Sequence, residues 1–284
     1  MNVGGWSCIF LFLCQLLTLC YANCANNTVG GGTCFGTSSY FHHFAASTST
    51  TTNSNTIYLK QSNIAELTLG TRVMIIQMQG GLDFQMEIDP ESANFGKITN
   101  YGNLGVFEFN YIAGTQSSCA AGGSVIKLTT QLSNVYTVDE YSSFQVVKTL
   151  MCDTVNVIED IACVPWDGEK GGIVAIEART LNFNSHSILC GGAGFRGGQY
   201  HSTQCTSMDL SLTCESGEGG QKGESHAKYP DFGFCRGGWA TGGGGTPCNG
   251  TEIGINQNTG YGSGGGGSIG VFLRFFQLLF FEIK

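Results

Sequence analysis

Two glycine-containing motifs in the sequence could carry chemistry. Residues 192–197 match G-x-G-x-x-G, which in dinucleotide-binding proteins joins a strand to a helix whose N-terminus meets a pyrophosphate. Residues 223–227 (GESHA) come close to the G-x-S-x-G turn that exposes a nucleophilic serine in hydrolases. No helical pattern follows either motif, and glycine-rich chains match such patterns by chance. The sequence therefore predicts no cofactor and no catalytic residue, and a secreted hydrolase is the least favoured function.

Acidic residues form two clusters whose carboxylates could bind Ca²⁺ or, as a pair, hydrolyse glycosides. The first cluster contains Asp83, Glu87, Asp89 and Glu91, and the second contains Glu159, Asp160, Asp167 and Glu169. Neither has the spacing of a calcium-binding loop, so solvated acidic loops are the favoured interpretation. Adjacent His42 and His43 would point apart on a strand, and no C-x-x-C pair occurs, so no metal site is predicted.

The composition excludes several classes of protein. Glycine accounts for 43 of 284 residues, charged residues for 12%, and the net charge is −8. A nucleic-acid-binding protein needs a basic surface, and no basic run is present. Only 4 prolines occur and there is no Gly-X-Y period, which excludes collagen, while 42% hydrophobic residues exclude a chain disordered by composition.

The N-terminal segment, residues 1–22, has the pattern of a secretory signal peptide. Its apolar stretch is short for a membrane span, and cleavage after Ala22 would leave small residues at the positions that signal peptidases prefer. An uncleaved membrane anchor is the alternative. Sequons at Asn26 and Asn249 predict N-glycosylation. We therefore expect a secreted, extracellular protein with no stable membrane span after cleavage.

Ten cysteines remain after removal of the signal peptide, and an even number permits five disulfides in an oxidising compartment. They are Cys24, Cys34, Cys119, Cys152, Cys163, Cys190, Cys205, Cys214, Cys235 and Cys248. Their spacing suggests pairing of sequence neighbours, one connectivity among many. The suggested bridges are Cys24–Cys34, Cys152–Cys163, Cys205–Cys214 and Cys235–Cys248, with Cys119–Cys190 across the fold.

Hydrophobic patterning predicts an all-β chain in which a small β-sandwich or barrel is followed by short β-solenoid-like strands and a disulfide-stapled glycine-rich region. The expected order is a Ser/Thr-rich linker (23–55), a β domain (56–165), a short-strand region (166–189), a glycine-rich region (190–268) and an apolar tail (269–284). Strands are expected at 56–59, 72–78, 106–111, 124–128, 144–148, 172–178, 180–184 and 187–189. Residues 72–78 hold a continuous apolar run of strand length, which is typical of a strand buried on both faces.

An ordered set of motifs extends over residues 55–268. It comprises the segments 69–80 and 101–109, PWDG (165–168), GGIVA (171–175), GFRGG (194–198), GGQKGE (219–224) and the glycine runs at 242–245 and 264–267. In this order they resemble a family of large secreted glycine-rich surface proteins that is common in Bacteroidetes, often ahead of secretion-sorting or adhesion domains. The cysteines and sequons predict a eukaryotic version. Because the chain stops where such relatives continue, a truncated C-terminus is expected.

The expected function is that of a secreted structural or adhesive protein of an extracellular matrix, coat or mineralised skeleton. The alternative is a carbohydrate- or receptor-binding module, because exposed aromatic rings stack on sugars. The candidate rings are Trp166, Tyr200, Trp239 and Tyr261. Extracellular matrix components or glycans are the expected partners.

Overall fold

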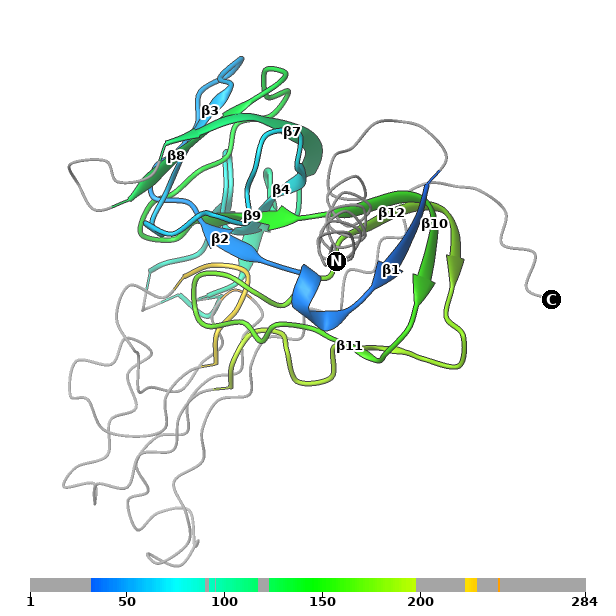
Figure 1. Ribbon diagram of the computed structural model, residues 1–284. Helices are drawn as coiled ribbons and strands as arrows, with labels where there is room; N and C mark the ends of the chain where they lie inside the picture. The colour runs from blue at the N-terminus through cyan, green and yellow to red at the C-terminus, as the bar shows by residue number, and fades with distance from the viewer. Residues whose placement is uncertain are drawn as a thin grey trace, which may run out of the picture.

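The computed structural model describes residues 32–89, 92–94, 96–116, 123–197, 223–228 and 240. These residues contain strands and one 3₁₀ turn, η1 (Ser38–Tyr40), but no α-helix. The strands form a curled antiparallel sheet and a short stack of parallel strands beside it (Figure 1). The prediction of an all-β chain with solenoid-like strands is therefore confirmed, and the expected small sandwich or barrel is a curled, half-barrel sheet.

The curled sheet has six antiparallel strands. In spatial order they are β2 (His43–Ala45), β9 (Ser143–Lys148), β4 (Arg72–Gln79), β7 (Phe107–Gln116), β8 (Ser124–Leu128) and β3 (Thr56–Leu59). An isolated antiparallel bridge between Ala46 and Leu59 joins β3 to the residue after β2, so the sheet curls until its edges approach each other. A separate hairpin pairs β5 (Gln85–Met86) with β6 (Ile98–Asn100).

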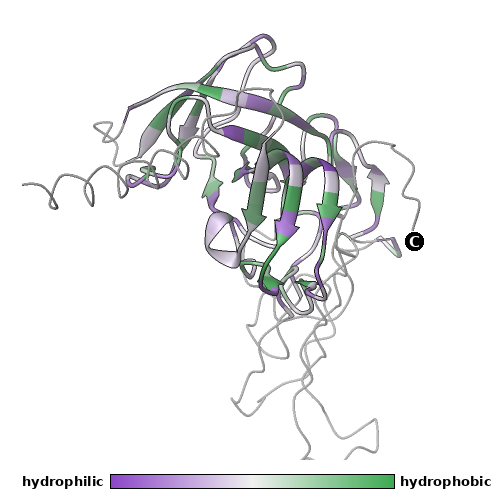
Figure 2. Ribbon diagram, turned by 45° about the vertical axis from the view of Figure 1, so that its right-hand side comes forward, coloured by the Kyte–Doolittle hydropathy of each residue, from purple (hydrophilic) through white to green (hydrophobic). Residues whose placement is uncertain are grey.

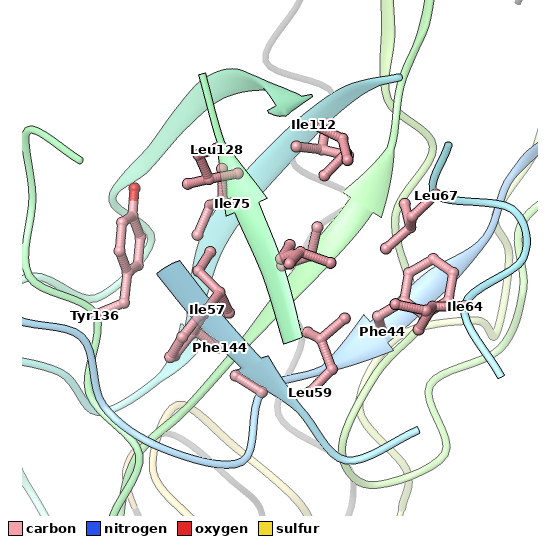
Figure 3. Close-up of a cluster of buried hydrophobic side chains, with 14 of the residues drawn as sticks. Phe44, Ile57, Leu59, Ile64, Leu67, Ile75, Ile112, Leu128, Tyr136 and Phe144 are labelled. Carbon is pink, nitrogen blue, oxygen red and sulfur yellow. The ribbon is translucent and has the colours of Figure 1, made fainter. Parts of the chain in front are cut away.

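The core of the curled sheet lies on its concave side, where Figure 3 shows the hydrophobic side chains pointing toward one another. Val73 and Ile75 of β4 point into this core, while Met74 and Ile76 pack on the opposite face in a second buried cluster. Strand β4 is therefore buried on both faces, as its continuous apolar run predicts. The opposite face is where the parallel strands attach.

The parallel stack is a short β-solenoid. Strands β1 (Thr33–Gly36), β10 (Leu150–Val157) and β12 (Ile176–Asn182) form one parallel sheet, and β11 (Ile161–Ala162) pairs in parallel with β13 (Ile188–Leu189). Leu150 aligns with Ile176 and Ile161 aligns with Ile188, so equivalent positions recur every 26 to 27 residues. A repeat of this length, with parallel pairing, means that each coil lies on the one before it.

The curled sheet is an insertion between the first two coils of the solenoid. Strand β1 pairs with β10, but the residues between them build the curled sheet. The chain enters that sheet through β2 and leaves through β9, and these two strands pair with each other (His43↔Val147). Two differences from the sequence expectation follow: β1 and β2 lie within the range expected to be a linker, and the solenoid begins before residue 166.

Candidate functional site

Several of the motifs that carry the family resemblance meet, in the part of the chain that the structure describes, at the joint between the solenoid and the curled sheet. Trp166 and Phe195 are 3% and 8% exposed, and their rings pack edge to face with centroids 5.2 Å apart. The ring of His226 lies edge-on to Phe195 at 6.1 Å, and burial lowers the pKa of His226. Both buried rings pack on Met74 and Met78 of β4. Since Trp166 is buried, the expectation that it stacks on sugars is wrong for this residue.

An ion pair closes this joint on its exposed side. Arg196 donates from Nε to Oε2 of Glu224 (3.0 Å) and from Nη2 to Oε1 (2.5 Å), and its backbone N–H also donates to Oε2 (2.8 Å). The Glu224 carboxylate raises the pKa of Arg196. Gly168 has φ +106°, a conformation that strains any residue with a side chain, and an added Cβ would also lie 2.5 Å from Nη2 of Arg196. The backbone N–H of Glu224 also donates to the carbonyl of Arg196 at 2.9 Å.

Buried glutamines attach the loops of the solenoid to the sheet. Gln145 of β9, fully buried, donates to the carbonyl of Gly171 and accepts from its N–H, both at 2.9 Å. Gln79 of β4 donates to the carbonyl of Ser225 at 2.7 Å. Their roles were not foreseen from the sequence, although polar glutamine within an apolar strand pattern is a signal that a buried amide needs a partner.

The two catalytic-looking motifs have structural roles in this joint. The Ser225 side chain is fully buried, and its hydroxyl donates to the carbonyl of Ala227 at 3.2 Å, so Oγ is not presented to a substrate. The described part of the G-x-G-x-x-G segment, up to Gly197, is a turn without a helix. Within the described residues, neither motif shows the geometry that its chemistry requires.

Carboxylates of the second acidic cluster bond to backbone groups of neighbouring turns. Glu159 accepts from the N–H of Ser38 at 3.0 Å, and Asp160 accepts from the N–H of Ser187 at 2.8 Å. Asp167 accepts from two N–H groups within its own loop. Of the first cluster, Glu91 lies outside the described residues. Within the described part of the chain, no group of three His, Cys, Asp or Glu residues is placed to hold a metal ion.

Two disulfides join successive coils, and they overturn part of the suggested pairing. Cys34 of β1 is bonded to Cys152 of β10 (Cα–Cα 6.0 Å), and Cys163 is bonded to Cys190 (Cα–Cα 4.9 Å). The suggested bridges Cys24–Cys34, Cys152–Cys163 and Cys119–Cys190 are therefore wrong. Pairing of sequence neighbours fails because parallel coils bring residues one whole turn apart into contact. Cys163 and Cys190 are therefore 27 residues apart, about one coil, while Cys34 and Cys152 are 118 apart because the curled sheet is inserted between their two coils.

The sheet β1–β10–β12 turns one face outward, away from the solenoid core. Cys34, Val155 and Leu181 form the inward row. We call the alternate residues the outer face: Thr33, Phe35, Thr154, Asn156, Thr180 and Asn182. Strand pairing arranges them in two columns, one of three threonines and one of a phenylalanine and two asparagines. Hydrophobic and hydrophilic residues are interspersed along the strands (Figure 2).

Several predicted positions lie outside the described residues. They are the glycosylation candidates Asn26 and Asn249, the aromatic residues Tyr200, Trp239 and Tyr261, and the cysteines Cys24, Cys119, Cys205, Cys214, Cys235 and Cys248. Within the described ranges, no helix is long and apolar enough to cross a membrane.

Comparison with known proteins identifies no family. The sequence matches no protein-family model and no curated protein. Among solved structures, the Gp54 tailspike of Acinetobacter baumannii bacteriophage AP22, in complex with A. baumannii capsular saccharide, is similar over 45% of this chain at 13% identity. That match spans 18% of the tailspike with a TM-score of 0.24, a similarity too weak to support an argument about fold or function.

Proposed function

We propose that this is a secreted structural or adhesive protein of an extracellular matrix or coat. The observation that carries the proposal is the position of the two disulfides, each of which joins one coil of the solenoid to the next. Disulfides persist in oxidising extracellular compartments, and crosslinks between coils resist separation of the stack. The signal-like N-terminus and the sequons agree with this location.

The motif residues support a structural role as well. Trp166 packs against the curled sheet, and Gly168, Arg196 and Glu224 hold the adjoining loops to one another. Two bodies joined by a buried aromatic cluster, an ion pair and buried amide bonds would hold a fixed orientation under load. A rigid body of this kind suits a protein whose role is mechanical or adhesive.

Proteomics of the insoluble extracellular fraction tests the proposal. The protein should be enriched in matrix extracted with denaturant and reductant, compared with the soluble fraction and with cell lysate. A protein recovered only from the intracellular fraction, with Cys34 and Cys152 as free thiols, would contradict it. Because Trp166 is buried, the carbohydrate-binding alternative requires a different binding surface. The outer face is such a surface.

A further inference from the structure

The outer face combines an exposed aromatic ring with uncharged hydrogen-bonding groups. The side chain of Phe35 is 55% exposed, although strand pairing holds its backbone in place. Asn156 of β10 is the strand partner of Phe35, and Asn182 donates from Nδ2 to Oδ1 of Asn156 at 2.8 Å. An amide offers two donors and an acceptor with two lone pairs, so each asparagine keeps hydrogen-bonding capacity beyond this one bond.

The nearby charges are compensated within the protein. Arg179 pairs with Asp153 at 3.0 Å on neighbouring strands, and Glu177 is held by Arg72 of the curled sheet at 2.9 Å. The columns of threonine and asparagine carry no charge. A highly charged partner would therefore gain little here, whereas a neutral partner rich in hydroxyl groups finds both donors and acceptors.

The spacing of the outer face suits an extended partner. Neighbouring strands are about 4.8 Å apart, so three strands present equivalent groups over roughly 10 Å. Along one strand, Thr180 and Asn182 are two residues, or about 7 Å, apart. A regular array of this kind presents the same groups repeatedly, as a polymer of similar repeating units does.

From this geometry we infer that the outer face binds a neutral polysaccharide. Phe35 packs against the apolar face of a sugar ring, and the hydroxyls of Thr154 and Thr180 with the amides of Asn156 and Asn182 bond to sugar hydroxyls. The inference rests on the proposed function, because it presupposes a location where extracellular glycans are present. It assigns the adhesive contact to one surface of the protein and to one chemical class of partner.

Binding of the full chain to insoluble cellulose, chitin and starch, and to a panel of soluble neutral oligosaccharides, tests this inference. A sulfated glycan serves as the charged comparison. We expect binding to at least one neutral polymer, weakened about tenfold by Phe35→Ala, which removes one ring contact. The double variant Thr154→Val, Thr180→Val keeps side-chain shape and β propensity but removes both hydroxyls, and should weaken binding several-fold.

The matched control is Leu189→Ala, which removes a side chain that is 53% exposed on the neighbouring β13 and should leave binding unchanged. Circular dichroism and the disulfide map establish that each variant folds. The inference is overturned if the wild-type chain binds none of the neutral glycans, if only the sulfated glycan binds, or if Phe35→Ala binds like wild type. Self-association that Phe35→Ala abolishes, without glycan binding, would also overturn it and assign the face to a second copy.

Matrix recovery separates this inference from the proposed function. A chain enriched in extracellular matrix whose outer-face variants bind glycans normally leaves the proposed function standing and overturns only the glycan site. A chain absent from matrix that binds neutral glycans through Phe35 supports the site and contradicts the structural role.

Discussion

Arg72 of β4 and Glu177 of β12 form an ion pair, with 2.9 Å between Nε and Oε2, that joins the curled sheet to the solenoid. The Arg72 guanidinium also lies over the rings of Phe109 and Tyr111, at 5.1 and 4.5 Å from their centroids. Tyr111 in turn donates from its hydroxyl to Sδ of Met151 in β10 at 3.2 Å. One side chain of the sheet therefore connects its own aromatic neighbours to a strand of the solenoid.

Replacing Arg72 with alanine should lower the free energy of unfolding by about 1–3 kcal/mol, since the variant loses a charge-assisted hydrogen bond and two cation–π contacts. Chemical denaturation at neutral pH measures the change. Arg179→Ala is the matched control: its side chain is 75% exposed and pairs with Asp153 on the surface, so a loss of about 0.5 kcal/mol or less is expected. Equal losses in the two variants would contradict the role assigned to Arg72.

Removing either disulfide should destabilise the fold, and Cys34–Cys152 should matter more. Its cysteines are 118 residues apart in sequence, against 27 for Cys163–Cys190, so it restricts a longer loop of the unfolded chain. Loop-closure entropy predicts a difference of about 1 kcal/mol between the two double Cys→Ala variants. Peptide mapping of the unreduced protein should first recover both bridges, and a Cys152–Cys163 peptide would contradict the arrangement of coils.

The pairing of Cys34 with Cys152 illustrates what the sequence could and could not predict. Residues 72–78 are recognisable as a buried strand because the unbroken apolar run 73–76 within them suits two apolar faces. Strand β10 is not, because Cys152, Asp153 and Asn156 interrupt its apolar alternation. Its stability comes from pairing with β1 and β12, which are distant in sequence. Local patterns do not contain such contacts, and the disulfide pairing depends on them.

The motif cluster was recognisable in sequence, but its role was not. Trp166, Phe195 and Glu224 belong to motifs that stand out from the surrounding glycines in sequence. Only the three-dimensional structure shows that they lie close together, against the face of β4 opposite the core of the curled sheet. The outer face was missed because its residues come from three strands, each carrying only one threonine of the column.

Acidification should weaken the joint through His43. Its Nε2 lies 2.7 Å from the carbonyl of Ile173, so the neutral ring donates from the sheet to the solenoid. Burial lowers the pKa of His43 to about 4 from an ordinary value of 6.5, with Lys170 and His42 adding to the shift. As the pH falls, the imidazole of His43 therefore takes up a proton in the unfolded chain before it does so in the folded chain. The stability that His43 contributes is fully present above pH 6.5 and is lost as the pH falls toward 4.

Denaturation measured between pH 7 and pH 4 tests this dependence. The contribution of His43 amounts to about 3 kcal/mol over that range, from the size of the pKa shift. In His43→Gln the amide can still donate to Ile173 but does not titrate, so the fall in stability should be smaller by about that amount. Parallel pH profiles for the variant and the wild type would show that His43 is not the responsible group.

Gly171 should tolerate substitution far less well than Gly191. Gly171 has φ +108°, and an added Cβ would lie 2.3 Å from the carbonyl oxygen of Pro165, a backbone atom that cannot move without disturbing the loop. The same glycine exchanges two hydrogen bonds with Gln145, so a shift of the loop also disturbs a buried amide. Gly171→Ala should therefore cost more than about 2 kcal/mol of unfolding free energy.

At Gly191 nothing lies within 4 Å of an added Cβ, and Gly191→Ala should change stability by less than about 1 kcal/mol. Thermal unfolding of the two variants side by side distinguishes a loop that is fixed against the sheet from one that is free to adjust, because a free loop would accept alanine equally well at both positions.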